Sequence, residues 1–130
     1  MLKMYLVSLL VFLGIDMVWL SVLAKDFYRN QIGGLMRNDV GWGWAVAFYL
    51  LFVVGLVVFV INPAVESRSI SRAVTRGVLF GLITYATYDL TNMATLKGWS
   101  WQVTVVDLIW GMVLSGLVAM ISSWVLMKWV

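Results

Sequence analysis

Four apolar runs, each about as long as a membrane is thick, dominate this sequence of 130 residues. They cover residues 4–24, 43–61, 74–96 and 103–127. A helix needs about 20 apolar residues to cross the hydrocarbon layer, and backbone polar groups cannot stay unpaired in lipid. Barrel strands would be shorter and would alternate in polarity. We therefore predict an all-α fold, an integral membrane four-helix bundle that forms a single transmembrane domain over residues 1–130.

The polar composition excludes most soluble alternatives. Charged residues make up only 12% of the chain, against about 25% in a soluble domain, so a water-facing surface cannot be built. Cysteine and histidine are absent, which removes disulfides, thiol catalysis, the usual haem ligands and His- or Cys-based zinc sites. The net charge of +3 is too small to suggest nucleic acid. Membrane lipids are the expected partners, and we predict no cofactor.

The first apolar run follows Lys3 and could be mistaken for a signal peptide. However, Asp16 interrupts the run and no clear small-residue cleavage site follows, so we expect a retained helix. Tryptophans near the ends of the runs fit an aromatic belt at the two membrane surfaces. They are Trp42, Trp44, Trp99, Trp101, Trp124 and Trp129.

The loop charges bear on orientation. With four spans, both termini lie on the same side as the loop between the second and third runs. That side carries Lys3, Arg68, Arg72, Arg76 and Lys128, and the other carries Lys25, Arg29, Arg37 and Lys97. This bias of five against four favours cytoplasmic termini. Arg68, Arg72 and Arg76 recur at every fourth residue, and we expect them to contact lipid head groups.

The segment 25–41 joins the first two runs on the other side. Tyr28, Ile32, Leu35 and Met36 have the spacing of an amphipathic helix, which Gly33 and Gly34 weaken or break. We expect a short interfacial segment that rests on the bundle.

Three aspartates inside apolar runs are the most informative residues: Asp16, Asp89 and Asp107. An aspartate at the centre of a membrane helix costs roughly 2.5–3.5 kcal/mol, and such residues usually face the bundle interior. With alternating helix directions and ~1.5 Å of rise per residue, all three fall in one half of the bilayer, roughly 6–12 Å below the outer surface. We therefore expect a polar region in that half.

The third run is half polar. At 100° per residue a narrow stripe forms, flanked by Tyr85 and Asp89, and it includes Gly77, Gly81, Thr84, Tyr88, Asn92 and Thr95. Gly77 and Gly81 form a G-x-x-x-G pair, which permits close helix approach. We expect this face to pack against the other helices.

The first and fourth runs contain the same Asp-x-x-Trp motif. Asp16 and Trp19 share a face in one, as do Asp107 and Trp110 in the other. Two interpretations stay open. In the first, a pocket open toward the outer side binds a small or lipid-like ligand, which the protein could also transport or modify. In the second, the aspartates of a structural or accessory subunit only fix helix packing or assembly. The pocket would be lined by Asp16, Trp19, Tyr85, Tyr88, Asp89, Asn92, Asp107 and Trp110.

The chemistry of the predicted pocket is not fixed by these residues. Buried carboxylates suit cation binding, proton exchange or general acid–base work, and with amides and hydroxyls they can hold a hard cation. No catalytic residue and no metal site is assigned. A channel or transporter of four short helices would need a homo-oligomer to enclose a pathway.

Several short motifs resemble one family along almost the whole chain. They are Asp16-x-x-Trp19-Leu20, Phe48-Tyr49, Pro63-Ala64, the run from Tyr88 to Leu96, and Asp107-x-x-Trp110-Gly111. Together these motifs resemble the DUF2177 family of bacterial membrane proteins. The resemblance implies four membrane helices and a bacterial inner-membrane location. It implies no activity, because the family has none assigned; its members often occur beside genes for lipid modification.

Overall fold

The computed structural model describes residues 1–129, and these are helical throughout apart from short connections. The elements are α1 (Leu2–Val18), η1 (Trp19–Leu23), α2 (Lys25–Ile32), η2 (Gly33–Leu35), α3 (Trp42–Leu56), η3 (Val57–Ile61), α4 (Asn62–Glu66), α5 (Ile70–Thr95) and α6 (Trp101–Lys128). Here η1 and η3 are π-helical turns that continue α1 and α3, and η2 is a single 3₁₀ turn. No strand occurs within residues 1–129. The expectation of an all-helical protein is confirmed.

Among the described residues, three helices are long and apolar enough to cross a membrane: Leu2–Val22, Trp42–Glu66 and Trp101–Lys128. They correspond to the first, second and fourth predicted runs. The third run is also helical, as the 26-residue α5. Its polar side chains lower its average hydropathy, so α5 is not one of these three helices.

Two serines explain why α5 and α6 begin earlier than predicted. Ser69 Oγ accepts a hydrogen bond from the backbone N–H of Arg72, and Ser100 Oγ accepts one from that of Val103. Such N-caps satisfy donors that have no partner within the helix. The helices therefore start at Ile70 and at Trp101, not at residues 74 and 103.

Pro63 does not end the second predicted span, and this corrects the expected boundary at Ile61. The helix runs on through Pro63 to Glu66. Proline lacks an N–H, and its ring crowds the carbonyl four residues earlier. The π-helical turn η3 stands directly before it, and the N–H of Asn62 bonds to the carbonyl of Val57, five residues back. This wider turn lets the helix continue through the proline.

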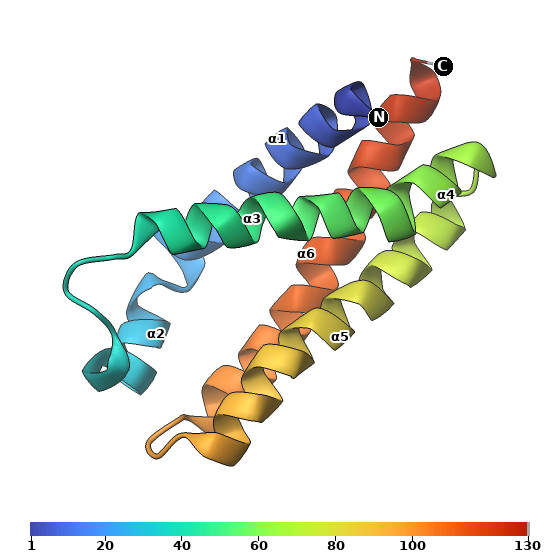
Figure 1. The fold of residues 1–130 in the computed structure, drawn as a ribbon. Helices are drawn as coiled ribbons and strands as arrows, with labels where there is room; N and C mark the ends of the chain where they lie inside the picture. Colours follow the sequence, from blue (N-terminus) through green and yellow to red (C-terminus); the bar gives the residue numbers. More distant parts are fainter. Residues whose placement is uncertain (130) are drawn as a thin grey trace.

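The closest helix pair is formed by α5 and α6, which lie side by side (Figure 1). Gly77 and Gly81 of α5 are buried against α6. A Cβ at Gly77 would lie 2.7 Å from the carbonyl oxygen of Ser115, and one at Gly81 would overlap the carbonyl oxygen of Gly111. Only glycine permits this approach, so the predicted packing of the G-x-x-x-G face is confirmed.

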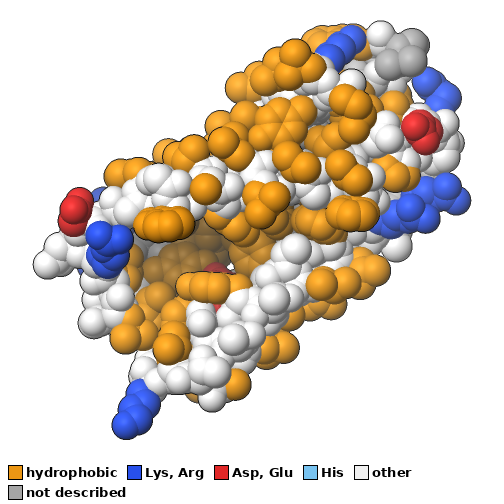
Figure 2. All heavy atoms as spheres, viewed as in Figure 1, with side chains coloured by type: hydrophobic (Ala, Val, Ile, Leu, Met, Phe, Trp, Pro, Cys, Tyr) orange, Lys and Arg blue, Asp and Glu red, His pale blue; other side chains and the backbone are white. Residues whose placement is uncertain are grey.

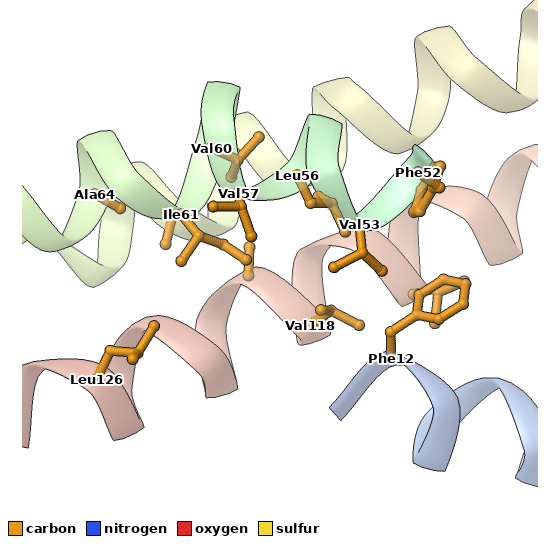
Figure 3. Packing of buried hydrophobic residues seen from close by; sticks show 13 residues of the cluster. Phe12, Phe52, Val53, Leu56, Val57, Val60, Ile61, Ala64, Val118 and Leu126 are labelled. Atoms are coloured by element: carbon orange, nitrogen blue, oxygen red, sulfur yellow. The ribbon is translucent and has the colours of Figure 1, made fainter. Parts of the chain in front are cut away.

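The apolar core lies between α1, α6 and the long helix made of α3, η3 and α4 (Figure 3). Phe12 of α1 packs on Phe52 with ring centroids 5.5 Å apart. Val118 and Leu126 of α6 close the other side of this cluster. The core therefore occupies the half of the molecule toward the termini.

Both termini and the α4–α5 turn lie at one end of the molecule, and α2 and the α5–α6 turn lie at the other (Figure 1). Consistent with this, the Lys3 ammonium lies 4.8 Å from the centre of the Trp129 ring. Phe52 packs against Phe80 and Tyr85 of α5. Toward α2, beyond Phe52, α3 and α5 diverge (Figure 1).

The segment after α1 is partly as expected. Its α-helix ends at Ile32, and the 3₁₀ turn begins at Gly33. Tyr28 and Ile32 are half-buried, but Leu35 and Met36, which share the predicted apolar face, are exposed. Only the first half of this segment therefore packs on the helices.

Candidate functional site

Two adjoining cavities, of about 290 Å³ and 320 Å³, occupy the space where α3 and α5 diverge. Figure 2 shows this hollow beneath α3, with an acidic side chain visible inside it. Four side chains border both cavities: Phe48, Tyr85, Tyr88 and Asp107. Thr84 borders the smaller one, and the larger one is also lined by Asp16, Trp19, Leu20, Tyr28, Ala45, Tyr49 and Trp110.

The two Asp–Trp motifs meet inside this site. Trp19 and Trp110 stack with ring centroids 4.4 Å apart and planes inclined by 10°. The indole N–H of Trp110 donates to Asp16 Oδ1 at 3.3 Å. Tyr49 lines the same cavity as Asp16. The first and last long helices are thus joined by an aromatic stack and a polar contact.

Tyr28 of α2 reaches into the site from the connecting segment. Its hydroxyl donates to Asp107 Oδ1 and accepts from the indole N–H of Trp19 at 3.4 Å. Burial, followed by the hydrogen bond to Asp107, raises the pKa of Tyr28 well above its ordinary value. The phenol is therefore neutral at physiological pH and keeps its donor for the carboxylate.

Tyr85 lies among the three predicted aspartates, close enough to interact electrostatically with Asp16, Asp89 and Asp107. Asp89 itself is completely buried. Within residues 1–129 neither of its oxygens finds a donor, and its polar neighbour is the carboxyl group of Asp107. Two carboxyl groups can form a hydrogen bond only when one of them carries a proton.

Six of the eight residues predicted to line a pocket do line the cavities: Asp16, Trp19, Tyr85, Tyr88, Asp107 and Trp110. Asp89 and Asn92 do not. Asp89 is completely buried near Asp107 of α6, and Asn92 lies near Tyr88 on α5. Residues of one helical stripe point in directions that differ by tens of degrees. The stripe therefore does not tell which of them line a cavity and which are buried between helices.

Sequence reasoning missed three further aromatic residues at the site: Tyr28, Phe48 and Tyr49. Tyr28 was predicted only as part of an amphipathic helix. Its place directly after α1 and η1 is the signal that could have identified it, because a short segment that follows a long helix must turn back over the neighbouring helices. Phe48 and Tyr49 belong to a uniformly apolar run whose periodicity indicates no preferred face.

The ionisable side chains that line the cavities are acidic. Among the described residues, no Lys or Arg side chain lines either cavity, although Lys25, Arg29, Arg37 and Lys97 lie at the same end of the chain's fold. In residues 1–129 no group of three acidic side chains is close enough to hold a metal ion. The chemistry of the cavities is thus that of two accessible carboxyl groups in an aromatic surround.

The three predicted lipid-contact arginines remain exposed at the opposite end. Arg72 and Arg76 lie on α5, but Arg68 is in the preceding turn with a positive φ of 49°. Its guanidinium donates to the carbonyl oxygen of Met127 at 3.4 Å, near the end of α6. The three therefore do not form a continuous helical row, and their contact with head groups stays a prediction.

An all-helical chain with three helices long and apolar enough to cross a membrane is an integral membrane protein. More particularly, the chain belongs to the DUF2177 family, described as predicted membrane proteins, whose family model matches residues 1–124. A search of curated proteins and a search of solved structures found no match to the chain.

Proposed function

We propose that this protein binds a small or lipid-like ligand in the cavities between α3 and α5. The observation that carries the proposal is the hollow of about 320 Å³, which has aromatic walls and two carboxyl groups, Asp16 and Asp107. Cavities of ~300–1,000 Å³ with apolar walls and a few converging polar groups are the usual form of a ligand site. The lining residues come from six elements: α1, η1, α2, α3, α5 and α6.

The opening of the cavities favours a ligand that arrives from the bilayer. Phe48 and Tyr88 border both cavities from opposite helices and are 48% and 57% exposed. The hollow in Figure 2 opens between α3 and α5, along the side of the molecule. On the water-facing end, α2 and its Tyr28 partly cover the site. A lipid-like molecule could therefore enter without crossing a polar surface.

In this proposal α5 crosses the membrane as a fourth span, within a four-helix bundle. Its 26 residues extend about 39 Å at ~1.5 Å per residue, and it packs along α6. Leu79, Ile83 and Leu90 are exposed and suit lipid. The hydroxyls of exposed Thr87 and Thr91 donate to carbonyl oxygens four residues earlier, at 2.6 Å each. Such bonds satisfy a hydroxyl group in lipid.

Four spans put both termini on the same side of the membrane. The bias of five basic residues against four supports a cytoplasmic side for them. We propose a multi-pass protein of the bacterial inner membrane, with the cavities in the outer half of the bilayer. Asp107 lies about 9 Å along α6 from Trp101, near the level of lipid head groups and the upper chains.

Retained lipid tests the proposal. Ala45 lines the larger cavity, so Ala45→Trp fills it, whereas Ala47→Trp adds the same ring at an exposed position of the same helix. Native mass spectrometry of purified wild type is expected to show one or more retained lipid molecules. We expect Ala45→Trp to lose them and Ala47→Trp to keep them. Equal retention by all three proteins would refute the proposal; the same spectra report the oligomeric state.

A second candidate is a structural or accessory subunit. The observation in its favour is that Asp16 accepts a hydrogen bond from Trp110 and Asp107 accepts one from Tyr28, so each carboxyl group joins two segments. Under this alternative, Asp16→Asn and Asp107→Asn would lower thermal stability or dissociate an oligomer. Neither variant would then change the retained lipid, because no ligand would contact the carboxyl groups.

A further inference from the structure

The chemical class of the ligand follows from what the cavity walls offer and what they lack. Asp16 and Asp107 both line the larger cavity, although each is largely buried, with 6% and 7% of its surface exposed. Within the described part of the chain, no basic side chain lines the cavity to neutralise them. In a site of low dielectric, carboxyl groups without a counterion attract a cation and strongly repel an anion.

The aromatic walls point to the same charge. Trp19, Tyr28, Tyr49, Tyr85, Tyr88 and Trp110 all line the larger cavity. The faces of such rings carry negative electrostatic potential and attract ammonium groups within about 6 Å. Indole and phenol rings do not coordinate hard metal ions, which prefer several oxygen ligands. An organic ammonium group fits this lining better than a bare metal cation.

Asp89 adds an independent observation. It is fully buried near Asp107, and both of its oxygens lack a donor among residues 1–129. Its proximity to Asp107 concentrates acidic groups on one side of the cavity with no compensating base. A cation held at Asp107 would relieve this imbalance.

We propose that the ligand is a cationic amphiphile whose ammonium group sits between Asp16 and Asp107. Its hydrocarbon chain leaves sideways between Phe48 and Tyr88 into the bilayer. This inference rests on the proposed function, because it assigns a chemical class to the ligand of the same cavities. It excludes fatty acids and other lipids whose head groups are only anionic.

Amphiphiles that differ only in head-group charge test the inference. The protein in dodecyl maltoside micelles, a neutral detergent with the same chain, is titrated separately with dodecyltrimethylammonium, dodecanol and dodecanoate. Binding is followed by native mass spectrometry and by the shift in thermal unfolding midpoint, since a ligand that binds the folded state raises it. We expect only the ammonium compound to bind. The quaternary ammonium group of this compound is charged at every pH, so the protonation state of the ligand does not affect the comparison.

Substitutions at the cavity test which residues bind the ammonium compound. Asp107→Asn and Asp16→Asn keep side-chain shape and should weaken dodecyltrimethylammonium binding at least tenfold. Asp39→Asn removes a carboxyl group in an exposed loop and should leave the affinity unchanged. Ala45→Trp should abolish binding of any amphiphile. The unfolding midpoint of each variant without ligand shows whether the variant is folded.

The outcomes separate the two proposals. If dodecanol or dodecanoate binds as well as the ammonium compound and Ala45→Trp blocks it, the cavity binds ligands but the cationic class is wrong. Unchanged affinity of the folded Asp16→Asn and Asp107→Asn variants for dodecyltrimethylammonium would also overturn the cationic class. If no amphiphile binds and no lipid is retained, both proposals fail.

Discussion

Trp19 and Trp110 stack nearly parallel, with their ring centroids 4.4 Å apart, although 90 positions of the sequence separate them. Each belongs to an Asp-x-x-Trp motif, and Trp110 donates to the aspartate of the other motif. The two motifs therefore form one structural unit, in which the rings wall the cavity and the carboxyl groups remain at its edge. This unit links α6 with η1, the π-helical turn that continues α1.

This stack has an optical signature. Two indoles in close contact couple their electronic transitions, which gives a paired positive and negative band in circular dichroism when the two transition dipoles are skewed. We predict that Trp19→Phe and Trp110→Phe each remove the same band from the spectrum of the protein in detergent. Trp44→Phe is the control, because Trp44 is 81% exposed. A spectrum that changes equally in all three variants would contradict the stacked pair.

Glycine at position 81 is predicted to be indispensable for the α5–α6 contact. A Cβ there would overlap the carbonyl oxygen of Gly111, which is backbone and cannot move aside. Overpacking of this kind costs about 1–3 kcal/mol, so Gly81→Ala should lower the thermal unfolding midpoint. Gly14→Ala, where nothing lies within 4 Å of the new Cβ, should leave it unchanged or slightly higher. Equal midpoints for the two variants would argue against the close pair.

Tyr28 should make stability depend on pH at the alkaline end. Its folded-state pKa is raised above the ordinary value of about 10 by burial and by Asp107. The stabilisation from the neutral phenol is therefore fully present below pH ~10 and is lost as the pH rises toward the folded pKa, because the unfolded phenol ionises first. We predict a smaller loss of stability above pH ~10 in Tyr28→Phe than in wild type.

Chemical denaturation in detergent at several alkaline pH values measures this difference. Tyr5→Phe is the matched control, since its hydroxyl donates to the carbonyl oxygen of Leu50 at an exposed site. The other tyrosines are common to both proteins, so their titration cancels in the comparison. Parallel curves for wild type and Tyr28→Phe would show that folding does not raise the pKa of Tyr28, which would contradict its burial beside Asp107.

Asp89→Asn is predicted to be as stable as wild type or more stable. An amide keeps the shape of the side chain and can donate to Asp107, whereas neither oxygen of the native carboxyl group has a donor among residues 1–129. Asp89→Leu should be less stable than Asp89→Asn, because leucine cannot donate to Asp107. Differential scanning fluorimetry compares them. A stable Asp89→Leu and an unstable Asp89→Asn would reverse this account of the pair.

Single cysteines test the number of spans, since the sequence contains none. We predict that Asn38→Cys and Lys97→Cys react with a membrane-impermeant maleimide from one side of the membrane and Ser67→Cys from the other. Intact cells and inverted vesicles provide the two sides. If Ser67→Cys and Lys97→Cys always react together, α5 does not cross. Ser67, Asn38 and Lys97 are all exposed, so accessibility does not bias the result.

The apolar runs sufficed to predict the helical class, and the G-x-x-x-G pair sufficed to predict the α5 contact. Each of these two signals can be recognised within the sequence of a single helix. The role of Tyr28 could not be predicted in the same way, because it depends on where α2 returns over the bundle. The second run was predicted to end at residue 61, but the helix continues through Pro63 because a π-helical turn precedes the proline. Hydropathy carries no signal for such a turn. The cavity-lining residues Phe48 and Tyr49 could not be predicted from periodicity, because their helix is apolar on every side.

The contacts of α2 have a consequence for biosynthesis. Tyr28 donates to Asp107, and Gln31 accepts from Ser100 at 2.7 Å, so its polar partners in the rest of the fold lie mainly in the last third of the chain. During synthesis α2 emerges early, but those partners are made only near the end. The segment therefore cannot make these contacts until α6 has been synthesised. A ribosome-bound chain that stops before Ser100 would leave α2 open to protease, and completion of α6 would close it.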